Sequence, residues 1–478
     1  MASGTPRVRF APAPTGLMHI GNVRTALLNY MYAQRYQGTF IIRVEDTDAE
    51  RNVDPQATNI IEQLTWLGLT FNEGPGIGGP HAPYFQSQRT ALYQQKLQEL
   101  EGKGALYRCF CTTEDLEKKR QRQILLKLPP RYDQTCLHLN EAQVADKMRT
   151  LPFIWRMKVM QDRTVTIKDL AHGQITFNLK EISDFPITRT DGTFTFIFAN
   201  AIDDIEMQIS HVIRGEDHLT NTAAQLVIYE QCGAPIPTFW HLPIICSVEG
   251  KKLSKRDFGF SLNDLRNAGY LPEAIDNYLG IIGGGTFEQE IVSLAQLAQA
   301  FNFESMHSTG HIKYDVQKLR WVNHQWMNQL SLADLTHRCM PFLTAAYPAA
   351  ANLNPAQREQ LIAAIRTDLV LLGDCTTLLK FYFEPPTTTA KDLVTVVGAE
   401  HVEPIRSIIL NNMSTLDSVE NFMTACKAAA QPLKLTKQLF WALRLFLTGS
   451  PEGLGVKELI QLLGVAESRK RLETALKN

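Results

Sequence analysis

The chain has 478 residues, of which 44% are hydrophobic, 20% charged and 9% aromatic, and its formal net charge is −1. Its length exceeds what one hydrophobic core usually organises and predicts roughly three domains, while its composition excludes the disordered and collagenous classes of protein. A charge so close to zero gives no overall attraction to a polyanion, so any surface for nucleic acid must be local.

The N-terminal residues lack the apolar run of a secretory signal, and nowhere do about 18 apolar residues follow one another as a membrane span requires. We therefore expect a cytoplasmic protein that does not contact a membrane. In that compartment the eight cysteines are expected to be reduced thiols or metal ligands rather than a disulfide framework.

The N-terminal region has the pattern of a nucleotide-binding βαβ unit. Residues 7–10 are β-prone, residues 11–21 form a loop broken by prolines and glycines, and apolar residues with helical spacing follow from Val23 to Met31. Residues 39–44 then predict a second strand. We expect the two strands to be parallel and joined by a right-handed crossover, an arrangement that binds nucleotides beyond the strand ends.

Two more helices are predicted after this unit. One should begin with Asp54 as N-cap and Pro55 as first residue, and the other should begin near Ser87. Glycine favours the backbone conformation that ends a helix, so Gly68 and Gly102 can terminate these two helices.

The middle of the chain predicts an inserted α+β module. From about residue 106 to residue 200, short β-prone pieces such as FIWRMKV (153–159) and GTFTFIFA (192–199) stand among charged stretches. The nucleotide-binding pattern returns after this module, with a strand predicted over 207–213 and a helix over 222–231.

Beyond about residue 300, helical periods dominate and strands become hard to find. The C-terminal portion is therefore predicted to be all-helical. Helices are expected over 361–372, 402–410, 433–447 and 456–463, and linkers are expected over 345–355 and 384–391.

The loop APAPTGLMHIGN, residues 11–22, is a first candidate for chemistry. It ends with His19 and Gly21 at a helix start, where backbone N–H groups and the helix dipole suit a phosphate. A histidine in this position can donate a hydrogen bond to charge that develops on phosphoryl oxygens. The alternative is an ordinary turn with a surface histidine.

A second candidate is the basic segment GKKLSKRDFG, residues 250–259. Mobile cations between glycines can neutralise a triphosphate and follow it into its transition state. The alternative is a solvated basic loop, which is the commoner meaning of a run of lysines. The two segments can converge on one triphosphate only if an insertion splits the nucleotide-binding domain.

In combination, these segments resemble the signature motifs of the class I aminoacyl-tRNA synthetases. APAPTGLMHIGN resembles the motif known as HIGH, and KLSKR resembles the motif known as KMSKS. The segments FIIRVEDTD, GGPHAPYFQSQR, YDQTC and VIRGEDH are similar to those of the bacterial-type glutamyl-tRNA synthetases. The resemblance runs in order from about residue 9 to residue 321 and weakens in the helical C-terminal third.

Three positions depart from the family pattern. Ala13 stands where the family usually has serine, Phe196 stands where a tyrosine is common, and Arg256 replaces the last serine of the second signature. The first change removes a hydroxyl expected near the amino acid. None of the three changes removes an essential charge.

The resemblance implies a class I glutamate–tRNA ligase that uses ATP and Mg²⁺. Such an enzyme activates L-glutamate as glutamyl-adenylate with release of pyrophosphate, and then transfers glutamate to the terminal ribose of tRNA(Glu). Because some bacterial members also charge tRNA(Gln), that tRNA is a second candidate substrate. The family's habit predicts a monomer.

The fold implied by the resemblance is multidomain α/β, with a Rossmann-like catalytic domain, an α+β acceptor-binding insertion and an all-α anticodon-binding region. The expected parts are the first catalytic half (1–105), the inserted acceptor-stem domain (106–200), the second catalytic half (201–255), a stem-contact region with the KLSKR loop (256–325), and two helical anticodon-binding subdomains (326–380 and 381–478).

The resemblance also implies a glutamate pocket, and the chemistry of its residues permits these roles. A guanidinium is suited to paired hydrogen bonds with a carboxylate, so Arg9 and Arg214 can bind the carboxylates of glutamate, and Glu45 can hold its ammonium group. Structural ion pairs at strand ends are the alternative. The expected set is Arg9, Ala11, Ala13, Glu45, Phe196, Asn200 and Arg214.

For the nucleotide, the resemblance implies two overlapping sets of residues. The expected ATP-binding set is Pro12, Thr15, Gly16, His19, Gly21, Lys252 and Lys255. The expected catalytic set is His19, Gly21, Lys252, Ser254, Lys255 and Arg256. No side-chain nucleophile is needed, because the α-carboxylate of glutamate itself attacks the α-phosphorus, and the protein holds the reactants and stabilises the extra negative charge.

A separate cluster, Cys109, Cys111, Cys136 and His138, has the pattern C-x-C, 24 intervening residues and C-x-H. Thiolates and imidazole suit tetrahedral zinc, and some bacterial members of the resembled family have a zinc site with this spacing. Tyr132 is an alternative fourth ligand, and buried reduced thiols are the alternative to zinc. The other histidines considered, which are expected to be loop or core residues, are His81, His172 and His241.

Three other functions are weighed against this one. A glutaminyl-tRNA synthetase normally opens with PEPNG rather than APAPTG and tends to have a β-barrel anticodon portion, whereas the C-terminal portion here is predicted to be helical. A nucleotidyltransferase with a similar histidine motif would not need the KLSKR loop joined to a helical appendage. A protein that only binds RNA would not need both phosphate signatures.

Overall fold

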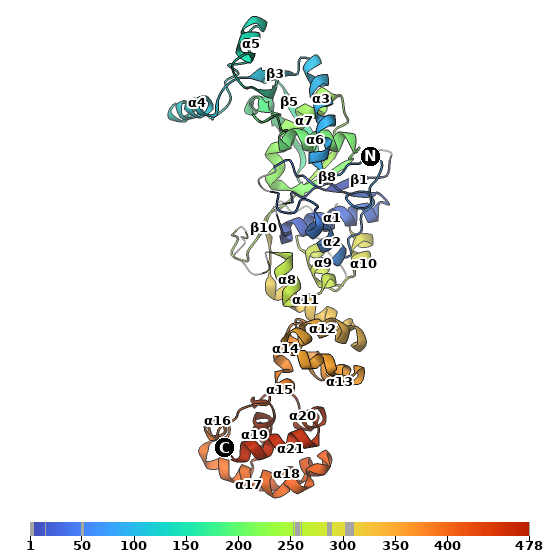
Figure 1. The fold of residues 1–478 in the computed structure, drawn as a ribbon, viewed down its shortest axis with the longest axis vertical. Coiled ribbons are helices and arrows are strands. Elements are labelled where there is room, and N and C mark those ends of the chain that lie inside the picture. Colours follow the sequence, from blue (N-terminus) through green and yellow to red (C-terminus); the bar gives the residue numbers. More distant parts are fainter. Residues whose placement is uncertain are drawn as a thin grey trace. The chain divides into compact units, whose positions relative to one another are not determined.

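The computed structural model describes residues 4–14, 16–48, 52–251, 253, 259, 261–283, 289–301 and 310–477. The chain divides into two compact units (Figure 1). The first unit consists of Met1–Arg266 and Pro272–Leu319, and the second consists of Asn267–Leu271 and Arg320–Asn478. The finer division into six parts stays a prediction.

The first unit begins with the predicted βαβ arrangement. Its elements are β1 (Arg7–Phe10), α1 (Ile20–Arg35) and β2 (Thr39–Ile42), and β1 pairs with β2 in parallel. Apolar residues recur along α1 at helical spacing, so side chains such as Leu27 and Met31 are fully buried. The predicted order of elements is confirmed, although β2 ends before the predicted Val44.

A second βαβ arrangement follows later in the chain. Its elements are β8 (His211–Gly215), α7 (Leu219–Cys232) and β9 (Thr238–Leu242), with β8 and β9 parallel. β1 lies beside β8, because Ser210 N donates to Arg7 O at 3.0 Å and Arg9 Nη1 reaches Ile213 O at 3.4 Å. The two strands therefore run in the same direction, and their carboxyl ends lie together.

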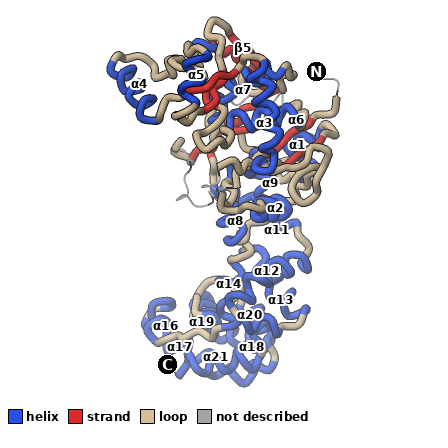
Figure 2. Tube along the Cα trace, turned by 45° about the horizontal axis from the view of Figure 1, so that its top comes forward, coloured by secondary structure: helices blue, strands red, loops and turns tan. Residues whose placement is uncertain are grey.

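The predicted α+β module is present between these two arrangements. Its strands are β3 (Leu106–Cys109), β4 (Ile154–Met157), β5 (Thr164–Asp169), β6 (Gly173–Asn178) and β7 (Phe185–Pro186). β3, β4 and β7 form an antiparallel sheet, while β5 extends the parallel strands by pairing with β9. α4 (Thr113–Leu125) and α5 (Glu141–Met148) bury no residue and extend away from the sheets in Figure 1, and Figure 2 also shows α4 projecting from the rest of the unit.

One predicted strand of the module is wrong. The segment GTFTFIFA was expected to be extended, but its second half begins α6 (Phe196–Glu206). Phenylalanine and threonine favour strands, yet this preference depends on context, and here Phe198, Ala199 and Ile202 are buried on a helix. The strand predicted over 207–213 consequently starts late, as β8 from His211.

Two predicted helix starts also shift along the chain. α2 (Thr58–Trp66) has Ala57 at its N-cap, but the Asp54 carboxylate accepts hydrogen bonds from Thr58 N at 3.0 Å and Asn59 N at 2.9 Å. Asp54 therefore satisfies the first free amides from outside the helix rather than as its N-cap. α3 (Thr90–Gly102) follows a 3₁₀ turn over Gln86–Arg89.

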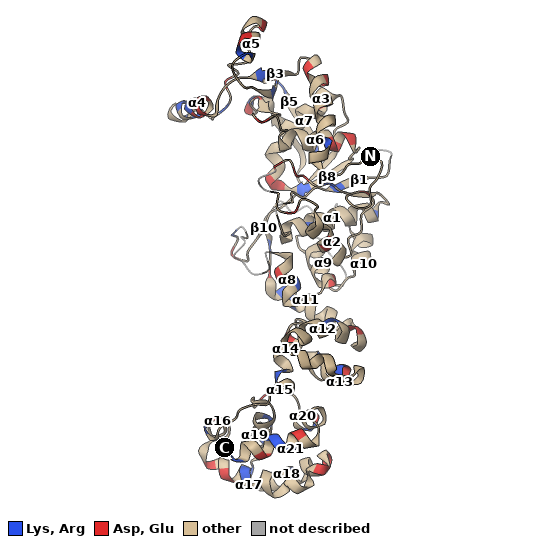
Figure 3. Cartoon of the chain, viewed as in Figure 1, with Lys and Arg blue, Asp and Glu red and all other residues tan. Residues whose placement is uncertain are grey.

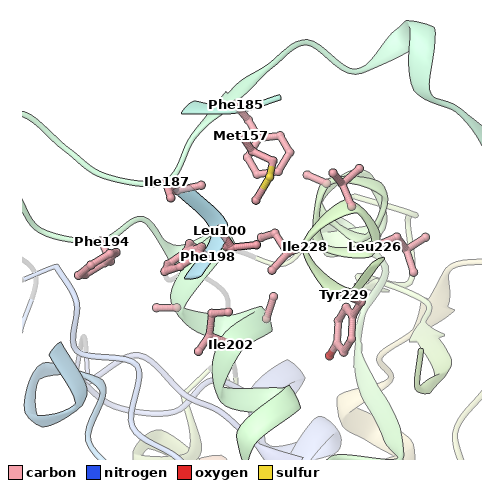
Figure 4. Close-up of a cluster of buried hydrophobic side chains, with 14 of the residues drawn as sticks. Leu100, Met157, Phe185, Ile187, Phe194, Phe198, Ile202, Leu226, Ile228 and Tyr229 are labelled. Atoms are coloured by element: carbon pink, nitrogen blue, oxygen red, sulfur yellow. The ribbon is translucent and has the colours of Figure 1, made fainter. Parts of the chain in front are cut away.

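A large hydrophobic cluster joins the inserted module to the parallel strands. Leu100 of α3, Phe198 of α6 and Ile228 of α7 meet Met157 of β4 and Phe185 of β7 (Figure 4). The members come from parts of the chain far apart in sequence. The cluster therefore fixes α6 and α7, which carry several residues of the site described below.

Further elements follow along the chain. They are β10 (Ile245–Cys246), α8 (Leu262–Ala268), α9 (Pro272–Ile281), α10 (Leu294–Ala300), β11 (Ile312–Lys313) and α11 (Val316–Gln329). β10 and β11 pair in parallel.

In the second unit, helices are the only regular elements over the residues that the structure describes, which confirms the all-helical prediction. They are α12 (Leu332–Ala346), α13 (Pro355–Ile365), α14 (Asp374–Leu378), α15 (Lys380–Phe383), α16 (Ala390–Val397), α17 (Val402–Asn412), α18 (Val419–Ala430), α19 (Thr436–Thr448), α20 (Val456–Leu463) and α21 (Val465–Lys477). The helix predicted over 361–372 ends early, at Ile365. The linker predicted over 345–355 contains a 3₁₀ turn, Pro348–Asn352, while 384–391 connects α15 to α16.

Membrane spans, thiols and charges were also expectations from the sequence. Among the described residues, no helix is both long and apolar enough to cross a membrane. All eight cysteines are free thiols. Acidic and basic residues occur together on several elements, and along α4 the acidic residues precede the basic ones (Figure 3).

Candidate active site

A cavity of about 280 Å³ lies where β1, β8 and the start of α1 come together. This is the place where parallel sheets with helical crossovers bind their ligands. The predicted site residues that line it are Arg9, Ala11, His19, Gly21, Glu45, Phe196, Asn200 and Arg214. The structure thus brings most of the expected glutamate-binding residues together with two of the expected phosphate-binding residues.

Three other predicted residues that the structure describes, Pro12, Ala13 and Gly16, are not among those that line the cavity. Pro12 is buried and its carbonyl accepts a hydrogen bond from Glu45 N at 2.9 Å, while Ala13 is exposed. Gly16 has a φ of +118°, which favours glycine, so it allows the loop to turn before α1. The predicted residues that lie outside the described part of the chain are Thr15, Lys252, Ser254, Lys255 and Arg256.

His19 caps α1 and also forms part of the cavity wall. Its Nδ1 accepts hydrogen bonds from Gly21 N at 3.1 Å and Asn22 N at 3.3 Å. In the neutral ring the proton must then be on Nε2, which can donate to a phosphoryl oxygen. A Cβ at Gly21 would lie 3.0 Å from the His19 ring, so glycine leaves room for this cap. The positive end of the α1 dipole lies at the same place.

Arg9 and Arg43 share the carboxylate of Asp204. Arg9 Nε lies 3.0 Å from Asp204 Oδ1, and Arg43 Nη1 lies 2.6 Å from the same oxygen. Burial raises the pKa of Asp204, but the two guanidinium groups outweigh burial and the pKa is lowered. The structural ion pair considered as an alternative for Arg9 therefore exists, although Arg9 lines the cavity as well.

Glu45 is held from two sides. Its Oε1 accepts hydrogen bonds from Arg43 Nη2 at 3.0 Å and from Asn200 Nδ2 at 2.5 Å. Burial raises the pKa of this carboxyl, and Arg43 opposes the rise only in part. Glu45 thus places a buried acidic group in the cavity wall, where a substrate ammonium would stabilise its ionised form.

Arg214 has no carboxylate partner among the described residues, in contrast to Arg9 and Arg43. Its side chain is almost fully buried, and Nη2 donates to Thr222 Oγ1 and to Gln225 Oε1, both at 2.7 Å. Burial lowers the pKa of this guanidinium to about 10. Because a buried cation is costly unless an anion neutralises it, this end of the cavity should attract a carboxylate.

Phe196 keeps the aromatic ring that the family pattern expects, without the hydroxyl of tyrosine. Its ring lies 5.5 Å from that of His218, centroid to centroid, and both residues line the cavity. Burial lowers the pKa of His218. Phe196 therefore contributes an apolar wall rather than a hydrogen bond.

Sequence reasoning missed several residues of this site. Thr222 and Gln225 are polar residues three apart on the mostly apolar α7, and this spacing on one helix face was a usable signal. Arg24 of α1 lines the cavity, is buried, and donates from Nη2 to Ile282 O at 3.1 Å. Arg43 and Asp204 gave no local signal, because their pairing joins segments far apart in the sequence.

The cysteine cluster lies in the inserted module. The Sγ atoms of Cys109, Cys111 and Cys136 lie within 4.8 Å of one another, and those of Cys111 and Cys136 are 3.7 Å apart. Tyr132 Oη lies 3.3 Å from Cys109 Sγ, whereas His138 is exposed and is not part of the group. Sulfur atoms about 3.8 Å apart match a tetrahedral zinc site with Zn–S bonds of about 2.3 Å. The thiols therefore fit zinc, and the predicted alternative Tyr132 is the nearby fourth group.

The reactivity of these thiols is uneven. A hydrogen bond from Cys136 is the main cause that lowers the pKa of Cys109 to about 4; burial opposes it and the Tyr132 hydroxyl adds to it. Zinc binds thiolates rather than thiols, so a thiol that ionises readily, as Cys109 does, is suited to be a zinc ligand.

Two known families and several known proteins are similar to this chain. The family of class I tRNA synthetases (E and Q), catalytic domain, matches residues 6–321, and the anticodon binding domain family matches residues 334–476. The glutamate–tRNA ligases of Sulfurihydrogenibium sp. (strain YO3AOP1) and Geobacillus thermodenitrificans (strain NG80-2) are 37% and 36% identical to it, over 98% of this chain and 99% and 98% of theirs. The crystal structure of a glutamate tRNA ligase from Elizabethkingia meningosepticum in complex with its amino acid superposes with a TM-score of 0.88 at 29% identity, and covers 99% of this chain and 100% of that chain.

Proposed function

Because the chain belongs to the class I tRNA synthetases for glutamate and glutamine, we propose that it attaches L-glutamate to tRNA(Glu) with ATP. The choice of glutamate as the amino acid rests on one observation. The buried guanidinium of Arg214 lines the cavity, and its hydrogen-bond partners are all neutral. The side-chain carboxylate of glutamate would neutralise this charge, and the amide of glutamine would not. The two glutamate–tRNA ligases named above, of which 99% and 98% are matched by this chain, support the same choice.

The remaining groups of glutamate find complementary partners in the same cavity. Glu45 would bind the ammonium group through its carboxylate, and Asn200, which already donates to Glu45, would add polar contacts. Arg9 would contribute to binding the amino acid's carboxylates although Asp204 neutralises much of its charge. The cavity would thus recognise both ends of the substrate.

In the first reaction, an oxygen of the glutamate α-carboxylate attacks the α-phosphorus of ATP. The bond from that phosphorus to the bridging oxygen breaks, and pyrophosphate leaves. His19 Nε2 and the positive end of α1 would stabilise the charge on the α-phosphate, while Lys252 and Lys255 would neutralise the β- and γ-phosphates. Mg²⁺, when bound with ATP, would supply further positive charge to the phosphates.

In the second reaction, the 2′-hydroxyl of the terminal ribose of the tRNA attacks the glutamyl carbonyl carbon, and AMP leaves. The inserted module would hold the acceptor end, and the helical second unit would read the anticodon. The match of residues 334–476 to the anticodon binding domain family supports the second assignment. tRNA(Gln) is a second candidate substrate, and a monomer is the expected assembly.

We also propose a structural Zn²⁺ bound by Cys109, Cys111, Cys136 and Tyr132. These residues come from the end of β3 and from the segment before α5, so the ion would join two parts of the inserted module that also meet in a small hydrophobic cluster. The ion has no part in the chemistry proposed above. It would fix the base from which α4 and α5 extend.

The test is attachment of radiolabelled glutamate to purified tRNA(Glu) and tRNA(Gln) with ATP and Mg²⁺. Wild-type protein should label tRNA(Glu), Lys255→Ala should lose labelling, and Lys103→Ala, which changes an exposed lysine of the same unit, should keep it. Labelling of both tRNAs would show that the protein accepts the anticodons of both tRNA(Glu) and tRNA(Gln). Labelling of neither tRNA would overturn the proposed function.

A further inference from the structure

Arg214 is held by a chain of buried hydrogen bonds that begins in the inserted module. Arg214 Nη2 lies 2.7 Å from Thr222 Oγ1, Thr222 Oγ1 lies 2.9 Å from His241 Nε2, and His241 Nδ1 lies 2.7 Å from Asp169 Oδ2. Thr222 and His241 are completely buried, and Asp169 is nearly so. The chain links β5 to β8 by way of β9 and α7.

The donors and acceptors of this chain can be assigned in one consistent direction. Arg214 can only donate, so it donates to the Thr222 hydroxyl, and an ionised Asp169 can only accept, so His241 Nδ1 donates to it. His241 Nε2 then carries a lone pair that accepts from the Thr222 hydroxyl at 2.9 Å and from Arg214 Nε at 3.4 Å. The Thr222 hydroxyl also lies 3.3 Å from His218 O, a longer contact than that with His241. The other tautomer would place the lone pair of Nδ1 against a carboxylate oxygen.

The protonation states agree with this direction. Burial lowers the pKa of His241, and this effect outweighs the hydrogen bond with Asp169, which raises it. Burial raises the pKa of Asp169, but hydrogen bonds from His241 and His172 outweigh burial and lower it. Asp169 is therefore an anion and His241 a neutral ring, so His241 adds no positive charge beside Arg214.

Asp169 is itself fixed on its second oxygen. Its Oδ1 accepts hydrogen bonds from Ala171 N at 2.9 Å and His172 N at 3.0 Å in the turn between β5 and β6. His241 N also donates to Asp169 Oδ2 at 3.1 Å. The carboxylate therefore cannot rotate without breaking several hydrogen bonds, and it holds the His241 ring in one orientation.

The same network extends from Arg214 to Glu45, which also lines the cavity. Gln225 Oε1 accepts from Arg214, Gln225 Nε2 donates to Asn200 Oδ1 at 2.7 Å, and Asn200 donates to Glu45. Arg214 thus has three partners, Thr222 and Gln225 at Nη2 and His241 at Nε, and all three are neutral. Neutral partners orient the guanidinium without neutralising it, which leaves its charge for a ligand.

We propose that Thr222, His241 and Asp169 are positioning residues that hold Arg214 for the side-chain carboxylate of glutamate and so set the preference for glutamate over glutamine. This inference rests on the proposed function, because it takes glutamate as the amino-acid substrate. None of the three lines the cavity, so they act through Arg214 alone. A displaced guanidinium loses its paired hydrogen bonds to a carboxylate, whereas an amide loses less.

The first test compares Thr222→Val with Thr222→Ser. Valine matches threonine in shape but removes the hydroxyl, and serine restores it. Thr222→Val should raise the KM for glutamate about tenfold, the factor that corresponds to about 1.4 kcal/mol, and lower the glutamate-to-glutamine ratio of kcat/KM by a similar factor. The KM for ATP should stay unchanged, and Thr222→Ser should recover most of the wild-type KM for glutamate.

The second test compares His241→Phe with His241→Gln, which separates the ring from its hydrogen bonds. The His241 ring is parallel to that of Phe239 to within 3°, at a centroid distance of 5.7 Å, and phenylalanine can keep that stacking. Glutamine keeps an acceptor that can face Thr222. His241→Phe should therefore behave like Thr222→Val, and His241→Gln should lie nearer the wild type. If one pair folds poorly, the other pair gives the same measurement.

The outcomes separate the inference from the proposed function. An unchanged KM for glutamate and an unchanged glutamate-to-glutamine ratio in Thr222→Val and His241→Phe would overturn the inference. So would a loss of kcat alone with the same KM, which is the result expected of a merely structural role. A wild-type protein that attaches no glutamate to tRNA would overturn the proposed function instead.

Discussion

Arg43 Nη1 lies 2.6 Å from Asp204 Oδ1, although the two residues are separated by 161 positions in the chain. Arg43 is fully buried, and a second carboxylate of the same helix, that of Asp203, lies 3.7 Å from its Nε. Asp203 Oδ1 in turn accepts from Arg89 Nε at 2.6 Å. Two adjacent acidic residues of α6, Asp203 and Asp204, therefore hold α6 against Arg43 and Arg89 by buried ion pairs.

Asp204→Asn should destabilise the protein strongly. The substitution leaves two buried guanidinium groups with less negative charge beside them, which costs about 3 to 5 kcal/mol when one partner of a buried pair is removed. Urea unfolding at neutral pH measures the difference, with the exposed Asp191→Asn as control. A loss below about 1 kcal/mol would contradict this account.

The ion pair of Asp204 with Arg43 also predicts that the unfolding free energy depends on pH. The pKa of Asp204 is lowered in the folded protein, so its stabilisation is present above the ordinary pKa of an aspartate and is lost as the pH falls through the lowered value. The difference in unfolding free energy between wild type and Asp204→Asn should therefore shrink in acid. A difference that stays constant into strong acid would show that the carboxylate is not the cause.

The predicted part of the site is the part that is local in sequence. His19 and Gly21 stand in one loop whose residues indicated phosphate binding, and Arg214 stands in a segment whose resemblance to the family implied carboxylate binding. His241 gave no such indication, because its partner Asp169 lies 72 positions away and belongs to the inserted module. Only the folded chain brings these two residues together.

The wrong prediction at α6 has a related cause. Phe194, Phe196 and Phe198 alternate with other residues in a way typical of a strand, and phenylalanine favours strands. In the structure α6 packs into the large hydrophobic cluster and also buries polar residues such as Asn200 and Asp204, so its polar residues do not mark a solvent-exposed face. A helix buried on several sides cannot be told from a strand by its periodicity.

Zinc content should distinguish the two candidate fourth ligands. Purified protein is expected to contain one zinc ion per chain, measured by inductively coupled plasma mass spectrometry. His138→Ala should keep the metal, because His138 is exposed and outside the thiol group, whereas Cys111→Ser should lose it and Tyr132→Phe should weaken it. Loss of zinc in His138→Ala comparable to that in Cys111→Ser would instead assign the histidine.

Glu45→Gln should weaken glutamate binding while it leaves the cavity intact. The amide oxygen can still accept from Arg43 and Asn200, but the charge that attracts the substrate ammonium is gone, so the KM for glutamate should rise about tenfold or more. Because burial raises the pKa of Glu45, the wild-type KM should also rise as the pH falls. The variant should lack that rise, and Glu99→Gln on the surface of α3 should behave as wild type. The same pH dependence in wild type and variant would contradict the role of Glu45.

Asp276→Asn should stabilise the protein at neutral pH. Asp276 lies on α9, only 2% exposed, and its Oδ1 has no hydrogen-bond partner among the described residues. Burial raises the pKa of this carboxyl well above its ordinary value, and the nearby Glu273 adds to the shift. The folded protein therefore favours the protonated form. The contribution of this carboxyl to the unfolding free energy is fully present below the ordinary pKa of an aspartate. It is lost as the pH rises through the raised pKa of Asp276.

Asparagine cannot ionise, so Asp276→Asn removes this loss and should gain about 1 to 2 kcal/mol at neutral pH, with less gain in acid. Urea unfolding of both proteins between about pH 5 and pH 8 measures the slope. Asp146→Asn, an exposed aspartate on α5, provides the matched control and should leave the slope unchanged. If wild type and Asp276→Asn instead have parallel curves over this range, the carboxyl does not change its ionisation on folding, and a partner outside the described residues must satisfy it.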